Sequence, residues 1–128
     1  MLRSMMQVYV NGSVEAVQLY QRAFDAKLIS EHKNEDGSYL HAELDIFGQV
    51  LALSELREEK NITGNTMQFC LQFNEADKII IEKAFMVLEK DAQILFPLGP
   101  CFFSSYMAGF IDKFGVNWCL LSSGNEFI

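Results

Sequence analysis

A histidine and a glutamate that could transfer protons stand two residues apart in the middle of the chain. His41 and Glu43 lie in the segment 39–46, whose composition predicts a β-strand. Alternate residues of a strand share a face, so both side chains are expected on one side of the sheet. The pair is a candidate general acid and base, because histidine titrates near neutral pH. The alternative is a polar pair on a solvated or dimer-facing strand.

The three cysteines are the other candidates for chemistry. Cys70, Cys101 and Cys119 are odd in number and lack C-x-x-C spacing, which predicts reduced thiols rather than a disulfide or a zinc site. No cation is close to Cys119 in the sequence, so we expect Cys119, and likewise Cys70, to be small buried hydrophobic residues. Cys101 lies in a Pro- and Gly-rich segment and is expected to be more accessible.

Length and charge limit the classes of function. A chain of 128 residues, half of them apolar, predicts one domain over residues 1–128. The formal net charge of −7 and the absence of a Lys and Arg cluster argue against nucleic acid and anionic membranes as partners. No apolar run approaches the ~18 residues needed to span a bilayer, and the first residues lack a signal-peptide run, so a cytoplasmic protein is expected.

The apolar pattern of the first half predicts a strand, a helix and three further strands. Asn11 or Ser13 is expected to cap the helix. The charged run from Glu55 to Asn61 is expected to be a linker. The predicted elements are the strand 5–10, the helix 14–24 and the strands 27–33, 39–46 and 49–54.

The second half repeats this order. Asn74 is expected to cap a helix that continues to Leu88. Residues 97–100 contain two prolines and predict an irregular loop, because proline removes a hydrogen-bond donor. The other predicted elements are the strands 67–73, 93–96, 102–111 and 116–121, followed by a tail over 122–128.

A duplicated Phe-Gly turn links the two halves. Phe47-Gly48 and Phe114-Gly115 each precede an apolar run of strand length, and superposing them aligns Ala52 with Cys119. We therefore predict an α+β fold of two βαβββ modules, about 1–60 and 65–122, forming a curved mixed sheet around a cavity. One module alone would leave a sheet face uncovered.

These features resemble the vicinal-oxygen-chelate superfamily, which includes glyoxalase I, bleomycin-resistance proteins and extradiol dioxygenases, and more closely its PhnB-like branch. The matching motifs occur in the family's order over nearly the whole chain. They are Asn11-Gly12, Glu15-Ala16, Leu19-Tyr20, Phe24 with Ala26, His41-Ala42-Glu43-Leu44, and Asp112-Lys113-Phe114-Gly115-Val116-Asn117-Trp118.

The resemblance implies where a metal would be bound. Metal enzymes of the superfamily place His, Gln or Glu ligands on the first and last strands of each module. The matching positions here are Met5 with Gln7, then Ala52, Gln68 and Cys119. Alanine offers no donor and only cysteine would bind zinc well, so we expect no metal and no other cofactor.

The resemblance also implies the ligand site. We expect the ligand-binding residues to be Gln7, His41, Ala52, Gln68, Phe103, Tyr106 and Cys119. For Phe103 and Tyr106 the alternative is packing in the core or at its rim. The branch commonly has a Trp near Phe103 and an Arg near Tyr106, and losing that cation argues against an anionic ligand. The leading hypothesis is a metal-independent homodimer that binds a small apolar or aromatic molecule. The alternatives are an atypical enzyme of the same fold, of lyase, dioxygenase or transferase type, using His41 or a divergent metal site, and a scaffold with a filled cavity.

Overall fold

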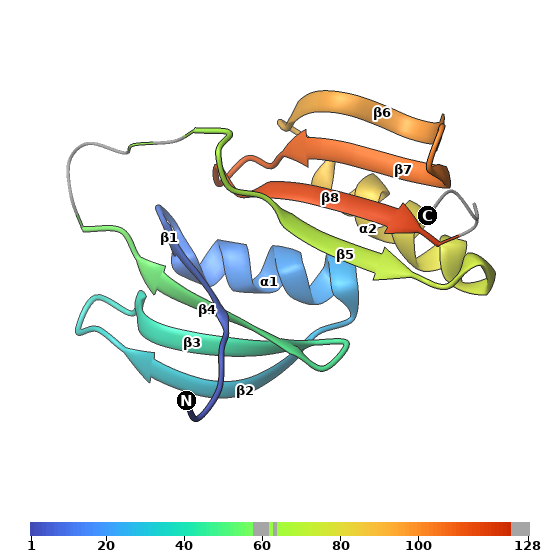
Figure 1. The fold of residues 1–128 in the computed structure, drawn as a ribbon. Helices are drawn as coiled ribbons and strands as arrows, with labels where there is room; N and C mark the ends of the chain where they lie inside the picture. Colours follow the sequence, from blue (N-terminus) through green and yellow to red (C-terminus); the bar gives the residue numbers. More distant parts are fainter. Residues whose placement is uncertain (58–61, 63, 124–128) are drawn as a thin grey trace. The chain divides into compact units, whose positions relative to one another are not determined.

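The chain forms two compact units that repeat one order of elements. A computed structural model describes residues 1–57, 62 and 64–123, and the units are Met1–Thr63 and Gly64–Ile128. Each unit contains a strand, a helix and three further strands (Figure 1). The predicted βαβββ duplication is therefore confirmed. The further prediction, that the two units form a single domain around a cavity, stays a prediction.

The elements of the first unit agree closely with those predicted from its apolar pattern. Its four-stranded sheet has the order β1-β4-β3-β2, in which β1 runs parallel to β4 and the other pairs are antiparallel. Residues 58–61 of the predicted linker lie outside the described residues, whereas Glu55 ends a strand. The elements are β1 (Met6–Val10), α1 (Ser13–Phe24), β2 (Lys27–Lys33), β3 (Tyr39–Ile46) and β4 (Gln49–Glu55).

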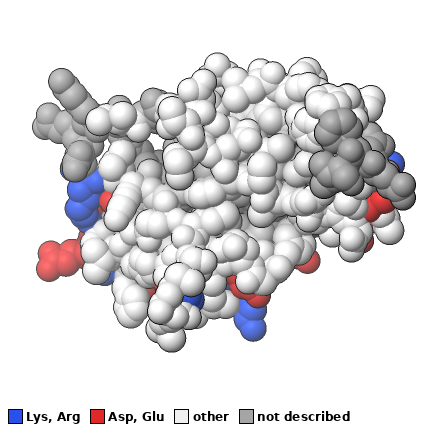
Figure 2. Space-filling view, in the orientation of Figure 1, with Lys and Arg blue, Asp and Glu red and all other residues white. Residues whose placement is uncertain are grey.

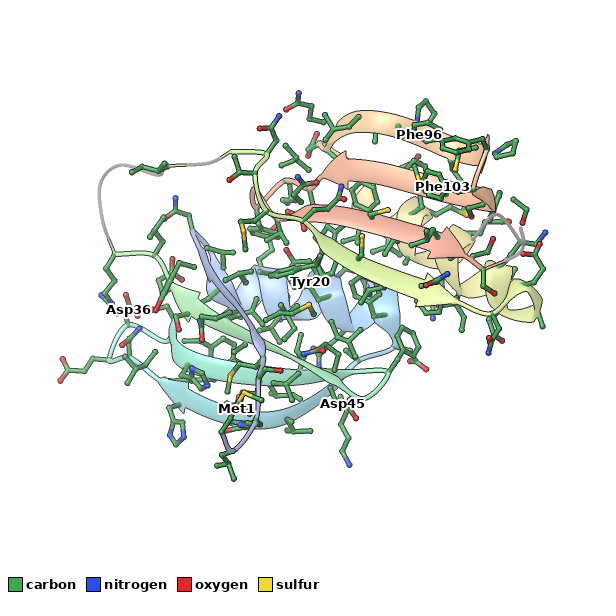
Figure 3. The ribbon with its side chains drawn as sticks, viewed as in Figure 1. Met1, Tyr20, Asp36, Asp45, Phe96 and Phe103 are labelled. Atoms are coloured by element: carbon green, nitrogen blue, oxygen red, sulfur yellow. The ribbon has the colours of Figure 1, made fainter. Side chains whose placement is uncertain are left out.

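Helix α1 packs on one face of this sheet. Tyr20 and Phe24 are buried and stack with ring centroids 6.5 Å apart, and Figure 3 shows Tyr20 on α1. Leu51 and Leu53 of β4 are also fully buried. Glu55 reaches the start of α1, so alternate residues of β4 point toward the helix and Ala52 points to the opposite face.

The start of α1 differs from the prediction that Asn11 or Ser13 caps it. Gly12 occupies the cap position with φ 87°, a left-handed conformation that glycine adopts without a Cβ clash, and it makes no side-chain cap. The Glu55 carboxylate instead accepts from the amides of Gly12 and Ser13, each at 2.9 Å. A distant acid on β4 therefore satisfies the first amides of the helix.

The second unit has the same topology. Its sheet has the order β5-β8-β7-β6, with β5 parallel to β8 and the remaining pairs antiparallel. In the part of the chain that the structure describes, no helix is long and apolar enough to cross a membrane. The elements are β5 (Phe69–Phe73), η1 (Glu75–Asp77), α2 (Lys78–Leu88), β6 (Gln93–Cys101), β7 (Ser104–Ile111) and β8 (Asn117–Ser122).

The predicted irregular loop over residues 97–100 is wrong. These residues belong to β6, which continues from Gln93 to Cys101 with several register shifts against β7. Strand β6 is the edge of its sheet, where a proline can turn its donor-free side away from the neighbouring strand. The prolines are therefore tolerated in the strand and only distort its register.

The core of the second unit lies between α2 and the sheet. Phe85 of α2 meets Phe110 of β7 edge to face at 5.5 Å. Asn74 makes no side-chain cap, contrary to expectation, and is followed by the short helix η1 before α2 begins. Asp112 accepts from the indole Nε1 of Trp118 at 2.9 Å and from the amides of Phe114 and Val116. That carboxylate holds the turn between β7 and β8.

Candidate functional site

The first sheet carries a buried carboxylate on the face opposite α1. Glu43 is paired in register with Ala52, so both residues lie on that face. The guanidinium of Arg3 donates to both Glu43 oxygens, at 2.9 and 2.8 Å. His41 Nε2 is 2.8 Å from Glu43 Oε2. The structure thus brings His41 and Glu43 together on one strand face, in the arrangement that their spacing predicted.

The two partners of Glu43 determine its charge. The hydrogen bonds from Arg3 and then His41 outweigh the effect of burial and lower the pKa of Glu43 from 4.5 to about 2. Glu43 is therefore ionised at neutral pH and can only accept hydrogen bonds, so the His41 Nε2 must donate. If His41 acts as a base in its neutral form, the accepting nitrogen is Nδ1.

Arg3 is the member of this cluster that the sequence did not indicate. It lies in the segment that precedes β1, and this segment crosses the sheet near β3 (Figure 1). Met1 and Leu2 are fully exposed, whereas Met5 is half-buried. Arg3 and Glu43 are 40 residues apart, so no short spacing in the sequence indicates that they pair. The only signal for Arg3 in the sequence is that it is a single cation in a segment with few polar residues.

Gln7 and Ala52 lie side by side next to the carboxylate. Their strands β1 and β4 are parallel, and Gln7 is the register partner of Ala52. The Gln7 amide donates to the Ser54 hydroxyl and to the Val8 carbonyl, each at 3.2 Å. The first unit thus places Gln7, His41, Glu43 and Ala52 on one sheet face.

The second sheet carries two cysteines at equivalent positions. Cys70 and Cys119 are register partners on the parallel strands β5 and β8. Cys119 is buried, as predicted, and burial raises the pKa of its thiol to about 12, with smaller contributions from Cys70 and Cys101. The prediction that Cys70 is buried is wrong, because β5 is an edge strand and its Cys70 side chain is exposed. Cys101 has intermediate exposure, so the expectation that it is more accessible than the other cysteines holds for Cys119 and is wrong for Cys70.

The other predicted ligand-binding residues lie on different parts of the second unit. Gln68 donates to Asn117 Oδ1 at 3.2 Å and to the Trp118 carbonyl at 3.4 Å. Phe103 lies in the turn between β6 and β7 (Figure 3) and meets Phe102 edge to face at 5.2 Å.

Tyr106 points toward α2 and away from the cysteine pair. Its hydroxyl donates to Glu82 of α2 at 3.1 Å, and the ammonium group of Lys78 lies 5.9 Å from its ring centroid. Phe110, four residues later on β7, shares this face and contacts α2. Cys119 pairs with Gly109, so both residues face the same side of the sheet. Phe110 follows Gly109 directly on β7 and therefore faces the other side. Tyr106 and Cys119 therefore lie on opposite faces of the second sheet.

Charged side chains do not gather into a basic patch on the face drawn in Figure 2. That face is mainly uncharged, and the Lys, Arg, Asp and Glu side chains in view lie at its margins. The face drawn in Figure 2 therefore offers no basic surface that would track a phosphate backbone, in keeping with the formal net charge of −7.

Comparison with solved structures identifies the fold. A PhnB protein from Bacillus cereus, described as a putative 3-demethylubiquinone-9 3-methyltransferase, is 24% identical with a TM-score of 0.78, covering 94% of this chain and 98% of its own. Protein PA1353 from Pseudomonas aeruginosa is 22% identical with a TM-score of 0.79, covering 96% and 98%. The fosfomycin resistance protein FosX from Listeria monocytogenes is 14% identical with a TM-score of 0.70, covering 98% and 95%.

The chain has the vicinal-oxygen-chelate fold. The resemblance predicted from the sequence motifs is thus confirmed at the level of the fold, and a PhnB protein is among the structural neighbours. No family model matches the sequence, and no curated protein matches it.

The positions that bind metal in this fold carry unsuitable residues here. Ala52 has no donor atom, and Gln68, whose Nε2 donates to Asn117 and Trp118, offers a metal only its neutral amide oxygen. Burial raises the pKa of the Cys119 thiol to about 12, so a metal ion would have to displace the thiol proton before the sulfur could bind it. Within residues 1–57, 62 and 64–123, no group of three or more His, Cys, Asp or Glu side chains could hold a metal ion. The residues present do not fit the divalent metal of the fold family.

Proposed function

We propose that this protein binds a small organic molecule without a metal, in the manner of a PhnB-like member of the vicinal-oxygen-chelate fold. The observation that carries the proposal is the donor set at the four inherited metal positions. Ala52 has no donor atom and Gln68 offers only a neutral amide oxygen, so Cys119 is the one strong donor at these positions, and the described residues contain no group of three His, Cys, Asp or Glu side chains that could hold a divalent ion. The polar groups that remain, Glu43 and His41, are joined to each other and suit organic functional groups.

The solved neighbours support a small-molecule role, and one of them differs from this chain in holding a metal ion. A further FosX structure from Listeria monocytogenes holds Mn(II) and dihydroxypropylphosphonic acid. This chain lacks a comparable donor group among its described residues, so we do not assign it that metal-dependent reaction. The Bacillus cereus neighbour is named after a methyl transfer to a quinone, 3-demethylubiquinone-9. We propose a ligand that is largely apolar or aromatic, in keeping with the Phe-rich composition.

Two measurements on the same preparation test the proposal. A thermal-shift and native mass-spectrometric screen of drugs and aromatic metabolites should find compounds that stabilise the wild-type protein, because a ligand that binds only the folded state raises its stability. Elemental analysis of protein purified without chelator should find no stoichiometric Zn, Ni, Mn or Fe. Bound metal at one equivalent per chain would overturn the metal-independent role, and a screen with no hits would overturn the binding role.

A second candidate function is metal-free acid–base catalysis at His41. It is favoured by the 2.8 Å contact with Glu43, which orients the ring and fixes Nε2 as a donor. If a substrate is found, His41→Ala should reduce kcat at least ~100-fold, the usual effect of losing a general base. An unchanged kcat in this variant would remove the catalytic role and leave the binding role intact.

A homodimer and a cytoplasmic location complete the proposal. Among the described residues, the edge strands of the two sheets are β1 and β2 in the first and β5 and β6 in the second, and edge strands can pair with another copy. Sedimentation at micromolar concentration should give twice the chain mass of 14.6 kDa. A clean monomer under these conditions would contradict the dimer.

A further inference from the structure

One guanidinium satisfies both oxygens of the buried Glu43 carboxylate. Arg3 Nη1 donates to Oε1 at 2.9 Å, and Arg3 Nη2 donates to Oε2 at 2.8 Å. Two parallel N–H···O bonds between a planar cation and a carboxylate form the strongest common type of ion-pair geometry. The place beside Glu43 is thus shaped for a flat cation with two neighbouring donors.

The two sides of this ion pair are anchored very differently. Glu43 lies on β3, which is hydrogen-bonded to β2 on one side and to β4 on the other. Its side chain is 9% exposed, whereas that of Arg3 is 46% exposed. Arg3 belongs to no strand, and the hydrogen bonds described for it both go to Glu43. The carboxylate is therefore fixed, while the arginine can leave without disturbing the sheet.

Removal of Arg3 would leave the carboxylate in need of another cation. Glu43 would keep His41 as its described partner, but its two oxygens would lose the countercharge and the two donors that Arg3 supplies. A metal ion is a poor replacement, because His41 Nε2 already uses its proton toward Glu43 and the described residues contain no three-donor group. An organic cation with the geometry of the arginine head group fits best.

We propose that Glu43, oriented by His41, anchors a guanidinium or amidinium group of the ligand, and that Arg3 is an internal occupant of this site which the ligand displaces. This inference rests on the proposed binding function and specifies its ligand chemistry, namely an apolar or aromatic body that carries a planar cation. The displaced Arg3 remains tethered three residues before β1, so it competes with the ligand at a high effective concentration.

The test removes the internal competitor. Arg3→Ala should bind benzamidine and agmatine at least about tenfold more tightly than the wild type, measured by isothermal titration calorimetry, because no tethered cation then occupies Glu43. Butylamine, which has a single-point ammonium group, should gain less than agmatine. The double variant Arg3→Ala with Glu43→Gln should lose the gain. Arg57→Ala is the matched control, since Arg57 lies 3.7 Å from the exposed Asp36, and it should not create binding.

Equal affinity of wild type and Arg3→Ala for benzamidine, or undiminished binding by the double variant, would overturn the inference. If Arg3→Ala does not fold, the wild type itself gives the answer. Titration with benzamidine should then shift the NMR signal of the Arg3 side-chain Nε–H, and an unmoved signal at saturating benzamidine would overturn displacement. A ligand screen with hits that lack a cation would refute this inference while leaving the proposed function standing. Benzamidine binding to Arg3→Ala together with a screen that finds no ligand for the wild type would overturn both the proposed function and the displacement of Arg3.

Discussion

Replacing Glu43 by glutamine should destabilise the protein at neutral pH and not at acidic pH. The variant keeps the size of the side chain but removes the charge that Arg3 and His41 stabilise. One pKa unit corresponds to ~1.4 kcal/mol, so lowering the pKa of Glu43 from 4.5 to about 2 sets an upper limit of roughly 3.5 kcal/mol. Half of the Arg3 side chain is in water, which screens the pair, so we expect a loss of about 1–2 kcal/mol in the free energy of unfolding.

The sign of the pH dependence follows from the lowered pKa of Glu43. A carboxyl group whose folded-state pKa lies below its unfolded-state value contributes stability above the unfolded value. The contribution of Glu43 is therefore complete above about pH 4.5 and is lost as the pH falls toward 2. The difference between wild type and Glu43→Gln should be full at pH 7 and should nearly vanish near pH 2.

Urea unfolding followed by circular dichroism measures this difference. At a typical slope of ~2 kcal/mol per molar urea, Glu43→Gln should lower the midpoint by roughly 0.5–1 M at pH 7. Glu35→Gln is the matched control, because Glu35 is exposed and should shift the midpoint little at either pH. The reasoning is refuted if Glu43→Gln matches the wild type at pH 7, or if its deficit is the same at both ends of the pH range.

Three further predictions concern other parts of the two units. Ellman's reagent should modify the exposed Cys70 quickly and the buried Cys119 only on unfolding, so Cys70→Ser should abolish the fast phase that Cys119→Ser leaves intact. Burial alone would raise the pKa of Glu55, but hydrogen bonds from the amides at the start of α1 lower it. Glu55→Ala should therefore reduce the free energy of unfolding in urea by about 1–2 kcal/mol. An unchanged urea midpoint would argue against Glu55 as the cap of α1. Asp112→Ala should cost about 2–4 kcal/mol and alter the near-ultraviolet signal of Trp118, and an unaltered signal would contradict the indole bond.

Local patterns predicted most elements because they depend on neighbouring residues. The apolar stripe of α1 and the alternation of β2 and β3 gave bounds that agree with the structure to one residue. Phe47-Gly48 predicts a tight reversal, and the structure has φ of 52° at Phe47 and 90° at Gly48, the positive values that a primed hairpin turn requires.

The incorrect predictions share a physical cause, which is that tertiary partners decided the outcome. Residues 97–100 form part of β6 because an edge strand tolerates proline, and edge position is a property of the sheet. Glu55 replaced the expected caps at the start of α1 because β4 brings it there from more than 40 residues away. Cys70 is exposed and Cys119 is buried, although both lie in apolar runs, because β5 is an edge strand and β8 is an interior one.

The sequence by itself determined the duplicated βαβββ order and the shared face of His41 and Glu43, because both follow from periodicities of a few residues. The unsuitable donors at the inherited metal positions could also be named from the motifs alone. Only the tertiary structure decided that Arg3 forms an ion pair with Glu43, because that contact joins residues 40 positions apart. It likewise directed Tyr106 toward α2 and away from Cys119, since strand register and helix packing select the face that each side chain occupies.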